Sequence, residues 1–145
     1  MRAGTATRYV FAASRYFLAL LFLATGTGKL LDNRGFARVL ASYQFGLSET
    51  LLLPLALVIS LTELAIGINI LLGRGLSQNI LATLCFHLAY ASLAVTTLLR
   101  GISLANCGCL GVFLARPLRW MTVAEDLMLA AISLVCWLLL RRAAR

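Results

Sequence analysis

Charged residues are scarce in this chain of 145 residues: they make up 12% of it, whereas an average soluble domain has about 25%. Only five residues are acidic, and the chain has one histidine, one lysine and two prolines. Hydrophobic residues make up 61%. This composition excludes an ordinary soluble protein, and we expect a single integral membrane domain over residues 1–145.

The formal net charge of +8 would suggest a nucleic-acid partner if the protein were soluble. Here the arginines lie at the ends of apolar runs, where such side chains anchor helices at the membrane surface and attract anionic lipid. No basic stripe with interleaved aromatic residues is present. We therefore expect no nucleic-acid partner.

Four long apolar runs predict an all-α fold, a bundle of four transmembrane helices at about residues 9–31, 50–72, 77–99 and 117–140. The first run resembles a signal peptide, but it ends at Lys29 and Asp32 as a membrane span ends, so we expect it to be retained. Small residues at 24–28 favour close helix packing. Arg15 lies inside the first helix and must snorkel or find a partner. Residues 32–48 are predicted to include a short interfacial helix.

Residues 100–116 form a predicted loop that contains the stretch Cys107-Gly108-Cys109-Leu110-Gly111. Two cysteines separated by one residue can close a disulfide if the backbone allows it, and glycine supplies the backbone freedom. We therefore expect Cys107 and Cys109 to form a redox pair, with two chance cysteines in a tolerant loop as the alternative. Cys85 and Cys136 lie within apolar runs, and we interpret them as small hydrophobic core residues.

Glu63 and His87 are ionisable residues inside predicted spans, where a charge costs at least about 2.5–3.5 kcal/mol at mid-span. At 1.5 Å per residue they lie roughly 16 Å and 19 Å from the same end of a helical hairpin. We expect them to meet, directly or through water. The contact would be a proton station, a quinone-binding contact or a structural hydrogen bond.

Four charged residues lie at helix ends on the side of the predicted loop 100–116: Lys29, Arg100, Glu125 and Asp126. A nearby cation lowers the pKa of a thiol, and a carboxylate can carry the proton that exchange must move. We expect Lys29 to lower the pKa of one of the paired cysteines, with ordinary interfacial snorkelling as the alternative. Two thiolates fall short of a four-ligand zinc site, so no metal site is assigned, although a soft ion such as Cu(I) stays a third hypothesis.

An even number of spans places both termini on one side of the membrane and the loop 100–116 on the other. Loop cations are balanced, six on each side, so the positive-inside rule does not decide the orientation; Arg15 tips the balance slightly toward cytoplasmic termini. A persistent disulfide would place the loop on the non-cytosolic side.

The chain resembles the DoxX-like membrane proteins, in particular the MauE family, from about Arg15 to Leu140. Three motifs carry the resemblance: Gly28-Lys29, the segment 61–64 with Gly67, and Arg100-Gly101 ahead of residues 107–111, where the family usually has CGCFG. The resemblance implies a four-helix protein of a bacterial-type inner membrane with cytoplasmic termini. It further implies periplasmic disulfide chemistry at Cys107 and Cys109, maturation of a disulfide-rich dehydrogenase, and a thioredoxin-like partner.

The first functional hypothesis is a membrane thiol–disulfide redox component whose Cys107/Cys109 pair acts on the non-cytoplasmic face. Lys29 and Glu63 are further catalytic candidates. Electrons would pass to a periplasmic redox partner or to quinone near Glu63 and His87. The alternative is a non-catalytic structural subunit of a larger membrane complex, in which the two cysteines form a structural disulfide. The sequence leaves open whether the chain is itself an enzyme, which partner it has and in which direction electrons flow.

Overall fold

The computed structural model describes residues 5–143, and these residues form helices and loops with no strand. The helices are α1 (Thr5–Leu31), α2 (Asn33–Ser42), α3 (Glu49–Leu72), α4 (Leu76–Leu99) and α5 (Trp120–Ala143). Four of them, α1, α3, α4 and α5, are long and apolar enough to cross a membrane. The predicted all-α fold with four transmembrane helices is confirmed. Arg2 and Arg145, two of the cations counted above, lie outside the described residues.

Two helix boundaries have clear local causes. The short helix α2 begins after Asp32, whose carboxylate accepts a hydrogen bond of 2.8 Å from the backbone N–H of Gly35. α5 begins at Trp120, later than predicted, because Pro117 has no N–H to donate and restricts the residue before it. The N–H of Leu118 instead donates to the carbonyl of Leu104, 3.0 Å away, which ties the start of α5 to the loop.

The long helices pack as two pairs, α1 with α3 and α4 with α5. The α1–α3 contact is close because glycines lie in it: a Cβ atom at Gly26 would lie 2.9 Å from the backbone nitrogen of Leu64, and one at Gly67 would lie 3.0 Å from that of Leu23. The small residues of the first span therefore do favour close packing. α3 and α4 are in contact, as expected of a hairpin, although each packs more extensively against another helix.

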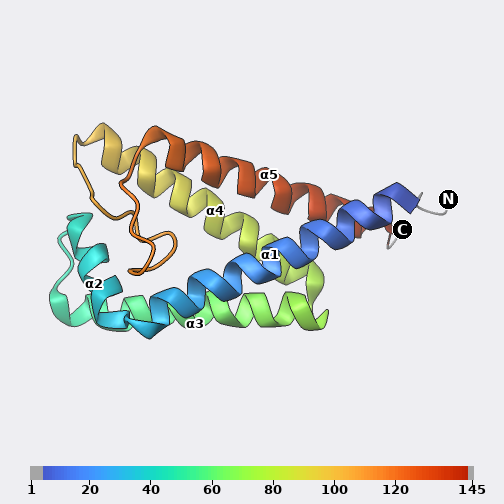
Figure 1. The fold of residues 1–145 in the computed structure, drawn as a ribbon, viewed down its shortest axis with the longest axis horizontal. Coiled ribbons are helices and arrows are strands. Elements are labelled where there is room, and N and C mark those ends of the chain that lie inside the picture. Colours follow the sequence, from blue (N-terminus) through green and yellow to red (C-terminus); the bar gives the residue numbers. More distant parts are fainter. Residues whose placement is uncertain (1–4, 144–145) are drawn as a thin grey trace.

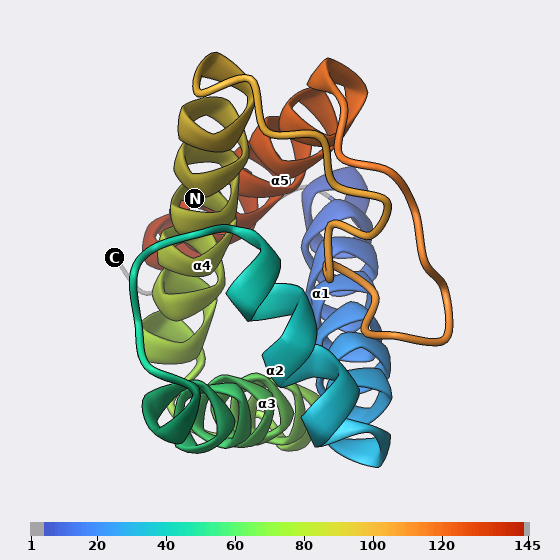
Figure 2. The ribbon, with the colours of Figure 1, turned by 90° about the vertical axis from the view of Figure 1, so that its left-hand side faces the viewer.

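Figure 1 shows the start of α1 and the end of α5 at one end of the bundle, and α2 with the segment 100–119 at the other. Seen from that second end, which we call the loop end, α2 and the segment 100–119 lie across the bundle (Figure 2). Arg15 lies toward the opposite end and donates to the carbonyls of Ile70 and Leu71, at 2.9 and 3.0 Å, in the last turn of α3. Arg15, which lies inside a predicted span and needed a partner, thus finds it at the C-terminal end of α3.

Candidate functional site

Hydrogen bonds fix the backbone of the cysteine motif. The N–H of Cys107 donates to the carbonyl of Arg116 at 2.8 Å, and its carbonyl accepts from the Tyr43 hydroxyl at 2.6 Å. Burial raises the pKa of Tyr43, so the hydroxyl keeps its proton and stays a donor. The N–H of Gly108 donates to the side-chain oxygen of Asn106 at 2.9 Å. The turn is therefore held by the rest of the loop and by the end of α2.

Glycine is required where this loop meets α1. Gly111 has a φ of 78°, in the left-handed region, and a Cβ atom there would lie 2.6 Å from the carbonyl carbon of Gly28. Gly108 has a φ of 73°. Gly111 thus lets the loop pack directly on the end of α1, so that Lys29 is covered by protein rather than by water. Gly108 lets the loop pack on Phe36 and Val39 of α2.

Cys107 and Cys109 are thiols with different surroundings. Cys107 is buried and Cys109 is half-buried. The N–H of Cys109 lies 3.4 Å from Sγ of Cys107. The hydrogen bond from the Cys109 side chain, aided by this N–H and by the Arg116 guanidinium, lowers the pKa of Cys107 to about 6 even though burial opposes it. The same side-chain bond, together with burial, raises the pKa of Cys109. The folded loop therefore favours the thiolate at Cys107 and the protonated thiol at Cys109.

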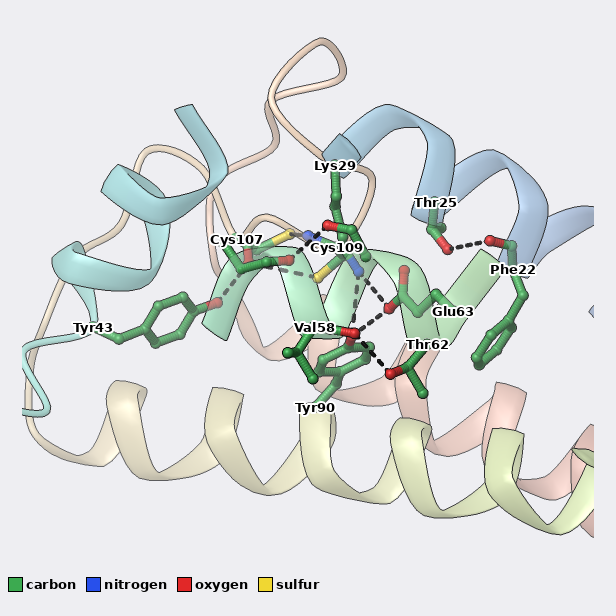
Figure 3. Close-up of polar contacts among 12 residues, drawn as sticks. Phe22, Thr25, Lys29, Tyr43, Val58, Thr62, Glu63, Tyr90, Cys107 and Cys109 are labelled. Carbon is green, nitrogen blue, oxygen red and sulfur yellow. Dashed lines mark hydrogen bonds and ion pairs between the residues drawn. The ribbon is translucent and has the colours of Figure 1, made fainter. Parts of the chain in front are cut away.

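Lys29, Glu63 and Tyr90 meet beside this pair (Figure 3). Nζ of Lys29 lies 2.5 Å from Oε1 of Glu63 and 3.2 Å from the Tyr90 hydroxyl, and that hydroxyl donates to the same carboxylate oxygen. The Lys29 and Glu63 side chains are each 1% exposed. Removal of one member would leave an uncompensated buried charge, so the three residues, one each from α1, α3 and α4, form a unit.

The expected direct contact between Glu63 and His87 is not formed. The Glu63 carboxylate pairs with Lys29, because α3 packs more extensively on α1 than on α4 and the long lysine stem reaches inward. Within residues 5–143, neither ring nitrogen of His87 has a hydrogen-bond partner, and its ring packs edge-on against Phe22. A contact through water and a role as proton station or quinone contact stay predictions.

Two cavities connect these groups. An inner cavity of about 110 Å³ is lined by, among others, Glu63, His87, Tyr90, Cys109 and Asp126. An outer cavity of about 70 Å³ lies nearer the loop end, and its lining includes Lys29, Tyr43, Cys107, Cys109 and Asp126. Cys109 lines both cavities, so one cysteine of the pair shares them with buried ionisable side chains.

The charged residues expected around the motif divide into two groups. Lys29 and Asp126 line the outer cavity with both cysteines. Arg100 instead donates to the carbonyls of Tyr43 and Gln44, each at 3.0 Å, and ties α4 to the loop after α2. The cation that lowers the pKa of Cys107 is Arg116, which sequence reasoning did not single out. Arg116 lies near Cys107 because the backbones of the two residues are hydrogen-bonded. No sequence pattern reveals that bond.

Tyr90 and Tyr43 are the other site residues that sequence reasoning missed. Tyr90 lies one turn after His87, so its place on the same helix face was a usable signal. Tyr43 lies in the segment 32–48, which was predicted only to include a short interfacial helix, and the folded loop shows its bond to Cys107. Cys136 is fully buried in an apolar cluster with Leu18, Phe22 and Ile70, as expected for a core residue, whereas Cys85 is exposed.

Comparison with known proteins agrees with this architecture. The family described as "Methylamine utilisation protein MauE" matches residues 7–139. The methylamine utilization protein MauE of Paracoccus denitrificans is 30% identical over 122 residues, which are 84% of this chain and 65% of the relative, so the chain spans slightly less than two thirds of that protein. No solved structure matches. The chain belongs to the MauE family of multi-pass membrane proteins.

Proposed function

We propose that this protein is a membrane thiol–disulfide exchange component in which Cys107 and Cys109 cycle between a disulfide and two thiols. The observation that carries the proposal is the hydrogen bonding that lowers the pKa of Cys107 to about 6 beside a second thiol. A low-pKa thiolate is a good leaving group in exchange. The half-buried Cys109 is the sulfur that a partner reaches more easily.

These properties favour a disulfide donor. A partner thiolate attacks Sγ of Cys109, the Cys107–Cys109 bond breaks, and Cys107 leaves with the electron pair as a thiolate. A second partner thiolate then attacks the partner sulfur of the mixed disulfide and releases Cys109. The partner gains one disulfide and the pair becomes two thiols, so electrons balance within the exchange. An acceptor with a disulfide or a quinone would re-oxidise the pair.

We further propose that the loop end faces the non-cytoplasmic side of a bacterial-type inner membrane and that the termini are cytoplasmic. The relative's name links it to methylamine utilisation. In this proposal the partner is a thioredoxin-like or other periplasmic redox protein of such a system, and Lys29 and Glu63 support the site by holding α1 and α3 beside the pair.

The test treats the oxidised protein with glutathione, quenches the reaction with acid and maps the attached glutathione by mass spectrometry. Glutathione on Cys109, with Cys107 free, is the expected result. Attachment to Cys107 would reverse the assigned roles.

A disulfide that persists without exchange would favour the second candidate, a structural subunit of a larger membrane complex. One observation favours that candidate: Cys107 is only 6% exposed and the backbone around it is fixed by hydrogen bonds on both sides. The glutathione reaction separates the two, because a purely structural disulfide would stay intact.

A further inference from the structure

We propose that Asp126 is the acid–base partner of Cys109: its carboxyl group gives a proton to the Cys109 sulfur as that sulfur is released, and takes it back when the pair is re-oxidised. This role rests on the exchange reaction proposed above. It assigns the proton of that reaction to one buried group of α5.

The position of Asp126 is unusual for a carboxylate. Asp126 is 5% exposed, and its Oδ2 atom has no hydrogen-bond partner in the described part of the chain. Buried polar atoms normally have partners, so an unpartnered carboxylate oxygen beside a cavity needs a functional or solvent explanation. Asp126 lines both the inner and the outer cavity, and so does Cys109.

The neighbouring acids do not offer the same geometry. Glu125 is bound to Arg116 at 2.8 Å near the surface, with its side chain 36% exposed. Glu63 holds Lys29 and Tyr90 through Oε1 and lines only the inner cavity. Apart from Cys109 and Asp126, the residue that lines both cavities is Tyr90, and its hydroxyl proton is donated to Glu63. Asp126 is therefore the acid that lines both cavities together with Cys109.

Cations and acids surround Asp126 on several elements, and any pH dependence will reflect all of them. The charged or titratable groups that face it or share its cavities are Lys29 from α1, Tyr43 from α2, Glu63 from α3, His87 and Tyr90 from α4, Cys107, Cys109 and Arg116 from the loop, and Glu125 from α5. The control is Glu49, an exposed acid at the start of α3 that lines neither cavity.

The inner cavity, which Asp126 and Cys109 both line, has room for water. Its volume of about 110 Å³ compares with the roughly 10–15 Å³ that one water molecule needs, so several waters fit. The unpartnered atoms Glu63 Oε2, Asp126 Oδ2 and both His87 nitrogens supply the polar partners that such water requires. In this proposal the proton moves between Asp126 and Cys109 through water in the cavity that both residues line.

The chemistry of Cys109 creates the need for this proton. The hydrogen bond to Cys107 and burial raise the pKa of the Cys109 thiol, so Cys109 is a poor leaving group as a bare thiolate. When the second partner thiolate attacks the mixed disulfide, the bond to Cys109 breaks and its sulfur takes the electron pair. The Asp126 proton passes to that sulfur and leaves a carboxylate. Re-oxidation returns the proton to Asp126.

The experiment uses the full-length protein in detergent micelles and glutathione as the probe. Two rates are measured across pH: formation of the mixed disulfide at Cys109, and its reduction by a second glutathione. Asp126→Asn is expected to slow the second step about 100-fold, the lower range of general acid–base catalysis, and to flatten its pH profile. The first step, in which Cys107 leaves, should be unchanged. Glu49→Gln, at an exposed acid that lines neither cavity, should follow the parent protein in both steps.

Three outcomes decide the matter. If Asp126→Asn and Glu49→Gln show the same second-step rate at every pH, the role of Asp126 is overturned. If the parent disulfide does not react with glutathione at all, the proposed function fails instead. If Asp126→Asn does not fold, as judged by helical circular dichroism and elution volume, the parent protein decides: a slower second step in D₂O than in H₂O, with partial activity in Asp126→Glu, supports the proton transfer, and equal rates in the two solvents overturn it.

Discussion

Cys107 and Cys109 share one loop but have opposite roles in one hydrogen bond. Cys107 accepts it and is stabilised as a thiolate, whereas Cys109 donates it and keeps its proton. The sequence predicted a pair from the spacing alone, but it did not show which sulfur is the thiolate, because that depends on Arg116 and on the Cys109 N–H. The asymmetry belongs to the folded loop.

Cys109→Ala should raise the pKa of Cys107 well above 6, since it removes the hydrogen bond that contributes most to the lowered value. The measurement is the ultraviolet absorbance of the thiolate against pH in the reduced protein. Cys136→Ala is the control, because that thiol lies in an apolar cluster away from the pair, and it should leave the midpoint near 6. An unchanged midpoint in Cys109→Ala would contradict the assignment.

The same pKa has a consequence for stability. A folded-state pKa of about 6, below the ordinary 9.0, means that the unfolded chain binds more protons between these values. The contribution of Cys107 to the free energy of unfolding is therefore fully present above about pH 9 and is lost as the pH falls through about 6. The melting temperature of the reduced protein should fall from pH 8 to pH 6, and it should fall by more than the melting temperature of Cys107→Ser does. Equal falls in melting temperature in the two proteins would contradict this.

At the level of helices, the pairing of α1 with α3 determines which buried charges meet. Apolar runs predicted the four spans, and Gly26 and Gly67 mark the close contact. Depth estimates along each helix placed Glu63 level with His87, but depth says nothing about which helices are neighbours. The Lys29–Glu63 pair follows from the packing of α1 on α3 and from the loop that covers Gly28.

Breaking this ion pair should destabilise the bundle more than replacing it does. Lys29→Met or Glu63→Gln alone leaves a buried charge or dipole without its partner, with an expected loss of about 3–5 kcal/mol in the free energy of unfolding. The double variant should lose less than the sum of the two. Denaturant titration in mixed micelles measures all four proteins. Additive losses would show that the two side chains do not act as a unit.

For the whole molecule, both described chain ends and the 73–75 turn lie opposite the loop end (Figure 1). This arrangement follows from an even number of spans and was predictable from the sequence. The orientation in the membrane was not, because the cations are nearly balanced between the two sides.

Labelling of single cysteines tests the proposed orientation. In a chain whose native cysteines are replaced by serine, Phe113→Cys and Arg74→Cys place a thiol at exposed positions on opposite sides. A membrane-impermeant maleimide added to intact cells should label position 113 at once and position 74 only after permeabilisation. The reverse pattern would put the loop end in the cytoplasm and remove the proposed periplasmic partner.

The most direct measurement is a redox titration of Cys107 and Cys109 in the full-length protein, equilibrated in glutathione buffers of stepped potential and scored by mass after alkylation. An exchange component should pass between one intramolecular disulfide and two free thiols in a single reversible two-electron transition, which disappears in Cys109→Ala. If the two sulfurs never form a bond with each other, or form one that no buffer potential alters, the exchange function is wrong.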